Sequence, residues 1–151
     1  MSKTLIVCAL YTETQNKLDD CDILYTGVGK VNATYKLTKS LLEGDYDLII
    51  NYGSAASKTH NGLVDCTRFI QRDMDASPLG FEPTITPFED ASVYAMDFSH
   101  IKNPINKNLT CYTGDSFVTD MTPYDGVVDM EAYALAKTCR NLGKSFVSYK
   151  Y

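Results

Sequence analysis

The chain has 151 residues, of which 44% are hydrophobic and 22% are charged, as in one globular domain with a real core. Its formal net charge of −5 and the lack of any Lys/Arg cluster argue against a nucleic-acid surface. The longest apolar runs, such as residues 5–10, are too short to span a bilayer, and the N-terminus shows no signal-peptide pattern. We therefore expect neither a nucleic-acid partner nor a membrane partner.

The five cysteines are widely spaced and form no C-x-x-C pair. We expect reduced, mostly buried thiols and therefore a cytoplasmic protein. Neither His60 nor His100 has a ligand-like spacing, so we expect no metal site, and no cofactor is indicated. The cysteines are Cys8, Cys21, Cys66, Cys111 and Cys139.

The first third of the chain alternates between strand and helix patterns. The continuous apolar run at residues 5–10 is typical of a strand buried on both faces. A shorter strand is predicted at 22–26 and stops at the turn 27–29, which reads Gly-Val-Gly. An apolar residue at every fourth position predicts a helix over 30–43, which Gly44 would cap. The apolar positions of this helix are Ala33, Leu37 and Leu41.

The rest of the chain continues the same alternation. A helix is predicted over 130–142, closed by Gly143. Residues 73–104 hold four of the five prolines and show no clear period, so we expect a long functional loop there. The pattern indicates a single α/β domain with a largely parallel sheet. The remaining strands are expected at 48–50, 63–71, 109–113 and 145–151.

Carboxylates and glycines follow several of these strands. Glu13 follows the first strand, 53–56 (Gly-Ser-Ala-Ala) follows the third, and Glu131 follows Val127-Val128. Ligands of open α/β sheets lie outside the carboxyl ends of the strands, so we expect one site at that rim. The turn 27–29 fits neither a Walker motif nor a dinucleotide fingerprint, which needs a glycine at Asn32. It is either a tight turn or a source of N–H groups for an anion or water.

Four motifs, in this order, resemble those of the nucleoside phosphorylase and nucleosidase superfamily, most closely its methylthioadenosine/S-adenosylhomocysteine nucleosidase branch. They are 27–31 (GVGKV), 51–55 (NYGSA), 114–117 (GDSF) and 129–132 (DMEA). The resemblance covers nearly the whole chain. It implies a three-layer α/β sandwich with a mixed, largely parallel central sheet, formed by one domain over residues 1–151. It also implies a homodimer or larger homo-oligomer and a small-molecule purine nucleoside as substrate.

The resemblance also assigns roles to individual residues. Glu13 would activate the water and Ser54 would help hold that water or an anion. Phe117 would stack on the purine and the backbone of Val118 would contact the base edge. Glu131 would accept hydrogen bonds from the ribose 2′ and 3′ hydroxyls, with Met130 packed on the sugar. Without the resemblance, Glu13 could be a surface charge, Phe117 a core aromatic, and Asp129 and Glu131 simple helix-dipole partners.

The resemblance favours hydrolysis over phosphorolysis, because Asn51 stands where phosphorylases commonly place an arginine. The chain departs from the family pattern in one important respect. The family places a Ser-Asp pair after the last strand, and the Asp of that pair is the general acid that protonates the purine. The chain stops at Tyr151. We therefore expect that the sequence is truncated or that the protein lacks its general acid. We expect the chain to be a poor nucleosidase that still binds nucleoside or adenine. We also expect Phe146 and Val147 of the last strand to be poorly covered. The alternatives are a phosphorylase and a non-catalytic nucleoside-binding protein.

Two further positions follow from the same resemblance. Asp115 is the first substitute to consider if another residue supplies the acid. The segment 78–81 lies in the loop that usually shapes the 5′ end of the substrate, so the identity of the nucleoside stays open.

Overall fold

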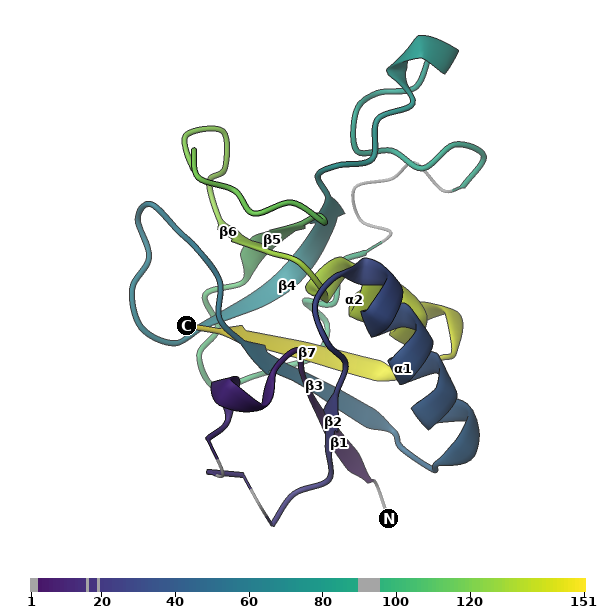
Figure 1. Ribbon diagram of the computed structural model, residues 1–151, viewed down its shortest axis with the longest axis vertical. Coiled ribbons are helices and arrows are strands. Elements are labelled where there is room, and N and C mark those ends of the chain that lie inside the picture. Colours follow the sequence, from purple (N-terminus) through teal and green to yellow (C-terminus); the bar gives the residue numbers. More distant parts are fainter. Residues whose placement is uncertain (1–2, 16, 19, 90–95) are drawn as a thin grey trace.

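A computed structural model of the chain describes residues 3–15, 17–18, 20–89 and 96–151 (Figure 1). It contains one curled sheet, two α-helices and two short 3-10 helices. The helices are α1 (Lys30–Glu43), α2 (Ala132–Asn141), η1 (Tyr11–Glu13) and η2 (Ser77–Leu79). The strands are β1 (Thr4–Cys8), β2 (Ile23–Tyr25), β3 (Leu48–Gly53), β4 (Val64–Gln71), β5 (Leu109–Thr113), β6 (Val127–Asp129) and β7 (Ser145–Lys150).

The sheet has seven strands in the order β2-β1-β3-β7-β4-β5-β6. Every neighbouring pair is parallel except β4 and β7, which pair antiparallel from Val64 opposite Lys150 to Cys66 opposite Ser148. The sheet therefore consists of two parallel groups that run in opposite directions. In a flat sheet the carboxyl ends of these two groups would lie at opposite edges.

Curling of the sheet brings the two groups together. Ala56, just after β3, pairs with Val128 of β6 through two backbone hydrogen bonds of 3.0 and 2.8 Å. The register between β4 and β5 also shifts between Cys66 and Arg68, so the pairing of these two strands is irregular there. The ends of β3, β6 and β7 consequently meet around one space, although β6 belongs to the opposite group.

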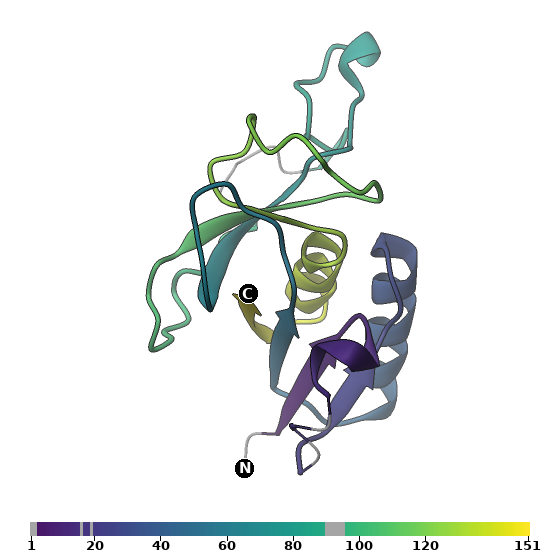
Figure 2. The ribbon, with the colours of Figure 1, turned by 60° about the vertical axis from the view of Figure 1, so that its left-hand side comes forward.

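The two helices pack against each other on the same side of the sheet (Figures 1 and 2). The bounds predicted for α1 are confirmed, as is its cap at Gly44. Its buried face is also the predicted one, namely Ala33, Leu37 and Leu41. Among the described residues both α-helices form one layer, so the second helical layer of the expected three-layer sandwich is not formed by them.

The predicted α/β class with a mixed, largely parallel sheet is confirmed. The predicted strands are all present with small shifts, and the second helix begins at Ala132 rather than at residue 130. The expected loop 73–104 contains only η2 as a regular element among its described residues, while 90–95 lie outside them. The cysteines carry free thiols, and all except Cys21 are buried, as expected.

The final strand is better covered than the sequence suggested. We expected Phe146 and Val147 to be poorly covered, but their exposed fractions are 1% and 8%. Phe146 packs edge-on against Phe69 and Phe98, with ring centroids 5.2 and 5.6 Å away. Phe98 comes from the 73–104 segment, whose packing against β7 the sequence does not reveal. No helix in the described part of the chain is both long and apolar enough to cross a membrane.

Leu37 provides a test of the core. It is fully buried on α1, whereas Leu79 in η2 is 74% exposed. We expect Leu37→Ala to lower the free energy of unfolding by about 2–5 kcal/mol, because it removes buried methyl groups and leaves a cavity. Leu79→Ala is the matched control and should change it by less than about 0.5 kcal/mol. Urea denaturation measures both, and equal losses would contradict the packing of α1.

Candidate active site

A pocket of about 520 Å³ lies where β3, β6 and the 114–118 segment meet. It brings together all the residues that the sequence assigned to a site, which come from four separate parts of the chain. The predicted convergence is therefore confirmed as geometry. The predicted site residues that line it are Glu13, Ser54, Phe117, Val118, Met130 and Glu131.

Glu13 is held by the loop that follows β3. It lies at the end of η1, and its Oε2 accepts hydrogen bonds from the Ser54 amide at 2.7 Å and the Ser54 hydroxyl at 3.3 Å. Its Oε1 accepts one from the Leu10 amide at 2.9 Å. Glu13 is thus a fixed carboxyl group facing the pocket rather than a free surface charge. Ser54 binds Glu13 directly, and its predicted contact with water or an anion stays a prediction.

The backbone of β3 leaves little room beside Glu13. A Cβ on Gly53 would lie 2.7 Å from Glu13 Oε2 and 3.5 Å from Lys150 Nζ. Only glycine allows the carboxylate to approach the strand this closely. Gly53 therefore places Glu13 and the end of β7 next to each other.

Glu131 reaches across to the other helix. It is the N-cap residue of α2 but makes no side-chain cap there; instead its Oε2 accepts a 2.8 Å hydrogen bond from the amide of Gly29, the N-cap residue of α1. Gly29 has φ of +98°, a conformation that other residues rarely adopt. The sequence left open whether the 27–29 turn is only a tight turn or also a source of N–H groups for an anion or water. Its N–H group binds a carboxylate of the protein itself.

Burial raises the pKa of Glu131 from 4.5 to about 7. The Gly29 amide and the Lys150 ammonium lower the pKa, and the neighbouring charges of Asp129 and Glu13 raise it. Desolvation outweighs the stabilising contacts because it penalises the ionised form directly. The helix-dipole support that we expected for Glu131 comes from α1, not from α2. A carboxyl group with this pKa exchanges its proton near neutral pH.

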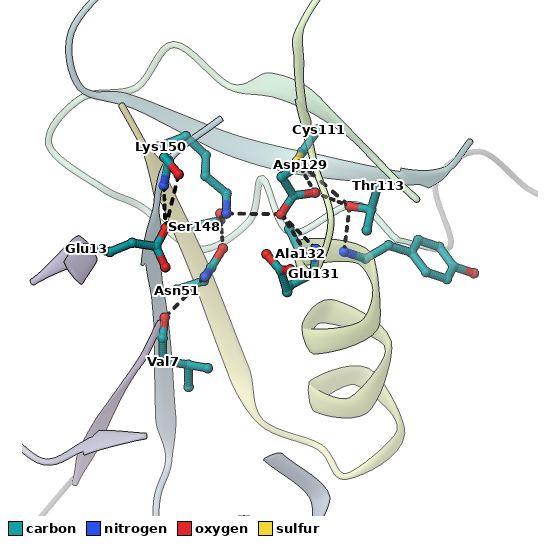
Figure 3. A network of polar contacts seen from close by, with 12 residues as sticks. Val7, Glu13, Asn51, Cys111, Thr113, Asp129, Glu131, Ala132, Ser148 and Lys150 are labelled. Carbon is teal, nitrogen blue, oxygen red and sulfur yellow. Dashed lines mark hydrogen bonds and ion pairs between the residues drawn. The ribbon is translucent and has the colours of Figure 1, made fainter. Parts of the chain in front are cut away.

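Asp129 and Lys150 form a buried ion pair next to Glu131 (Figure 3). Lys150 Nζ lies 3.0 Å from Asp129 Oδ2, and both side chains are almost completely buried. Burial alone would raise the pKa of Asp129, but Lys150 and three hydrogen bonds hold that pKa below its ordinary value. The donors of those bonds are the Thr113 hydroxyl at 2.5 Å, the Ala132 amide at 2.7 Å and the Cys111 thiol at 3.2 Å.

Sequence reasoning missed Lys150 and saw Asp129 only as a helix-dipole partner. Asp129 does bind the first turn of α2, but it also binds the ammonium that lies between the carboxyl groups of the site. A usable signal was present: the strand 145–150 carries no charge except a lysine at its end, and a buried lysine has to be paired. Its partner, 21 positions earlier, could not be identified without the fold.

The mouth of the pocket carries the predicted base-binding residues. Phe117 is 86% exposed, which excludes the alternative of a core aromatic. Val118 and Met130 are half-buried. An exposed aromatic ring beside an apolar pocket provides a stacking surface for a flat heterocycle.

Three other positions lie outside the pocket lining. Asp115 turns away to the start of α1, where its Oδ1 accepts a hydrogen bond from the Lys30 amide at 2.8 Å. The 78–81 segment projects away from the sheet at the top of Figure 1. Asn51 is buried and hydrogen-bonded to Val7 O and the Ser148 hydroxyl. Among the described residues, no group of three or more His, Cys, Asp or Glu side chains could hold a metal ion.

The curled mixed sheet is shared with a solved structure. The crystal structure of S-adenosylhomocysteine nucleosidase from Streptococcus pyogenes, in complex with 5-methylthiotubericidin, matches with a TM-score of 0.79 at 21% identity. The match covers 98% of this chain and 81% of that one. The chain therefore has the fold of that nucleosidase. No family model matches the chain.

Sequence relatives identify the family. A 5′-methylthioadenosine/S-adenosylhomocysteine nucleosidase from Anoxybacillus flavithermus is 30% identical over 169 aligned positions, covering 95% of this chain and 71% of the relative. One from an Exiguobacterium species is 33% identical over 147 positions, covering 83% of this chain and 63% of the relative. The chain belongs to the 5′-methylthioadenosine/S-adenosylhomocysteine nucleosidase family. It spans between 63 and 71% of the length of these relatives.

The ion pair yields the first prediction from the site. Lys150→Met should lower the free energy of unfolding by about 3–5 kcal/mol, because it leaves the buried Asp129 carboxylate without its partner. Lys3→Met is the control: the Lys3–Asp22 pair is 3.8 Å long and about half exposed, so its loss should cost at most about 1 kcal/mol. Urea denaturation at neutral pH measures both. Similar stability of the two variants would show that the pair contributes little.

The raised pKa of Glu131 predicts that the free energy of unfolding decreases as the pH rises. The native state holds this proton more tightly than the unfolded chain, so the stabilisation is complete below pH 4.5 and is lost as pH rises through about 7. Glu131→Gln keeps the shape without the charge and should be more stable than the wild type at pH 8, by about 1–3 kcal/mol, but not at pH 4.5. Urea denaturation at both pH values measures this.

Glu43→Gln, on the exposed surface of α1, is the control for that experiment and should show no pH-dependent difference. Equal stability of Glu131→Gln and wild type at pH 8 would contradict the burial of an ionisable carboxyl group at this position.

Proposed function

We propose that the chain hydrolyses the N-glycosidic bond of an adenine nucleoside and releases the free base. The observation that carries the proposal is the placement of Glu13 and Glu131, from η1 and the start of α2, on one pocket with an exposed aromatic residue at its mouth. The names of the relatives, which act on 5′-methylthioadenosine and S-adenosylhomocysteine, support the same chemistry.

The reaction divides between the two carboxyl groups. A glycosidic bond breaks through a sugar with oxocarbenium-like positive charge, which nearby carboxylates stabilise. Ionised Glu131 would accept hydrogen bonds from the ribose 2′ and 3′ hydroxyls, with Met130 against the sugar. Glu13 would take a proton from water as the water oxygen bonds to C1′. The bond from C1′ to the purine nitrogen breaks, and its electron pair leaves with the base, which then needs a proton.

The charges of the pocket favour water over phosphate as the nucleophile. Among the described residues, the lining contains no arginine or lysine side chain that could hold phosphate. The nearby Lys150 ammonium is already paired with Asp129. Asn51, at the position where phosphorylases commonly have an arginine, uses its amide within the core. Phosphorolysis remains the alternative that the experiment below separates.

Leaving-group protonation is the weak step of the proposed reaction. Asp115 points away from the pocket, and Asp129 is ionised in its pair with Lys150. General acid catalysis contributes about 10²–10⁴-fold, so we expect the 151-residue chain to bind adenine well and to turn nucleosides over slowly. Binding without turnover would correspond to the alternative of a nucleoside-binding protein.

We also propose a homodimer or larger homo-oligomer in the cytoplasm. Three large apolar side chains, Val31, Tyr35 and Leu42, are exposed along α1 and would be covered by a second copy. The free thiols of the buried cysteines fit a reducing compartment.

The function is tested by incubating the chain with 5′-methylthioadenosine, S-adenosylhomocysteine and adenosine, with and without phosphate. Chromatography measures adenine release and calorimetry measures adenine binding. We expect slow release that does not depend on phosphate. Glu13→Gln should lower it by about 10²-fold or more while adenine still binds, because only water activation is lost.

Glu43→Gln, an exposed carboxylate on α1, is the matched control and should behave as the wild type. A strict requirement for phosphate would replace hydrolysis by phosphorolysis. Full activity of Glu13→Gln would remove Glu13 from the catalytic role, and absence of both binding and release would overturn the proposed function.

A further inference from the structure

Three charged residues outside the pocket lining form a closed ring of contacts beside it. Lys30 begins α1, Asp73 lies two residues beyond β4, and Asp115 lies two residues beyond β5. Lys30 Nζ donates to Asp73 Oδ1 at 2.7 Å, and the Asp115 amide donates to Asp73 Oδ2 at 2.9 Å. The Lys30 amide donates to Asp115 Oδ1 at 2.8 Å and closes the ring.

The ring is partly shielded from water. The side chains of Lys30 and Asp73 are 16% and 31% exposed. Burial would raise the pKa of Asp73, but the hydrogen bonds from Lys30 and Asp115 hold it below its ordinary value, which indicates an ionised carboxylate. Charge-assisted hydrogen bonds in such a setting are stronger and more directional than an exposed ion pair.

One side of the ring touches the turn that holds Glu131. Gly29 donates its amide to Glu131 Oε2, and the next residue is Lys30, whose amide and ammonium are both bound within the ring. A Cβ on Gly29 would lie 3.3 Å from Asp115 Oδ1, so the turn and Asp115 are in close contact. The orientation of the Gly29 amide therefore depends on where the ring holds the start of α1.

The other side of the ring leads into the segment that lines the pocket mouth. Asp115 directly precedes Ser116, Phe117 and Val118, all of which line the pocket. Arg72, next to Asp73, donates to the Ser116 carbonyl oxygen at 2.6 Å and to the Ser116 hydroxyl at 3.1 Å. Asp73 and Arg72, which follow β4, thus hold the backbone of Asp115 and of Ser116 respectively.

We propose that Lys30, Asp73 and Asp115 are positioning residues of the proposed nucleosidase site. The ring that they form sets the Gly29 amide against the sugar-binding carboxylate Glu131 and, at the same time, sets the base-binding segment 116–118. It couples the two halves of the pocket although none of its members lines the pocket. The proposal rests on the proposed function for its substrate, but its geometric part can be tested without substrate.

The ionisation of Glu131 provides that test. The charged and polar groups that face Glu131 are Asp129 of β6, Lys150 of β7, Glu13 of η1 and the Gly29 amide of α1. Loosening of Gly29 removes the hydrogen bond that favours the carboxylate, so the pKa of Glu131 rises. Loss of the Asp73 charge alone would act in the opposite direction and lower that pKa. A rise in both Lys30→Met and Asp73→Ala therefore reports displacement of Gly29 and not a change in charge.

The experiment measures the Glu131 carboxyl titration by carbon-13 NMR in the full chain, assigned with Glu131→Gln. We expect the pKa to rise in Lys30→Met and in Asp73→Ala, and to return toward the wild-type value in Lys30→Arg. Lys137→Met is the matched control, because the Lys137–Glu89 pair is similarly short at 2.6 Å and also partly exposed, but neither of its residues lines the pocket. It should leave the titration unchanged.

Adenine binding by calorimetry gives the second arm, and the two ring variants should bind about tenfold more weakly than Lys137→Met. An unchanged Glu131 pKa in both ring variants, or a fall in Asp73→Ala, overturns the proposal. Dispersed amide spectra establish that each variant is folded, and Asp73→Asn replaces Asp73→Ala if it is not. If the wild-type chain binds no adenine, the proposed function fails while the titration still decides the role of the ring.

Discussion

The contact on which the structure depends is the buried ion pair between Asp129 and Lys150. It joins the end of β6 to the end of β7, two strands from groups that run in opposite directions. Two charges removed from water cost several kcal/mol each unless their hydrogen-bonding groups are satisfied. Here Thr113, Cys111 and the amides of Ala132 and Glu131 supply the remaining contacts of Asp129. The pair thereby fixes the start of α2, and with it the position of Glu131.

The same pair sets the electrostatics of the pocket. Lys150 neutralises Asp129, so Glu13 and Glu131 are the carboxyl groups left to face a ligand. Burial therefore affects the pKa of Glu131 more than any neighbouring charge does, and it raises that pKa to about 7. A pocket with two carboxyl groups and no unpaired ammonium among its described neighbours suits a reaction in which the sugar becomes positively charged. Stability and proposed activity therefore oppose each other at Glu131, as is common for buried functional carboxyl groups.

Much of the fold followed from local patterns. The helix over 30–43 was predicted to the residue, because Ala33, Leu37 and Leu41 recur at helical spacing between a Gly-containing turn and Gly44. The pocket residues followed from motifs, since Glu13, Ser54 and Glu131 each come just after a strand. The antiparallel pairing of β4 with β7 could not be predicted, because strand periodicity carries no information on direction. The cover of Phe146 by Phe98 was missed for a related reason: the 73–104 segment has no periodic pattern from which its packing could be inferred.

The sequence by itself determined the class of fold, the strands and helices, and six of the residues that face the pocket, because these depend on side-chain periodicity and on short motifs. Only the tertiary structure decided how those residues interact. It showed that the amide of Gly29 binds Glu131, that Asp129 binds Lys150, and that Asp115 turns away to Lys30. These contacts join residues 21 to 102 positions apart, in a sheet that is curled enough for Ala56 to pair with Val128. Charge pairing between residues that are distant in the chain depends on the curling of the sheet, and no local stretch of sequence encodes that curling.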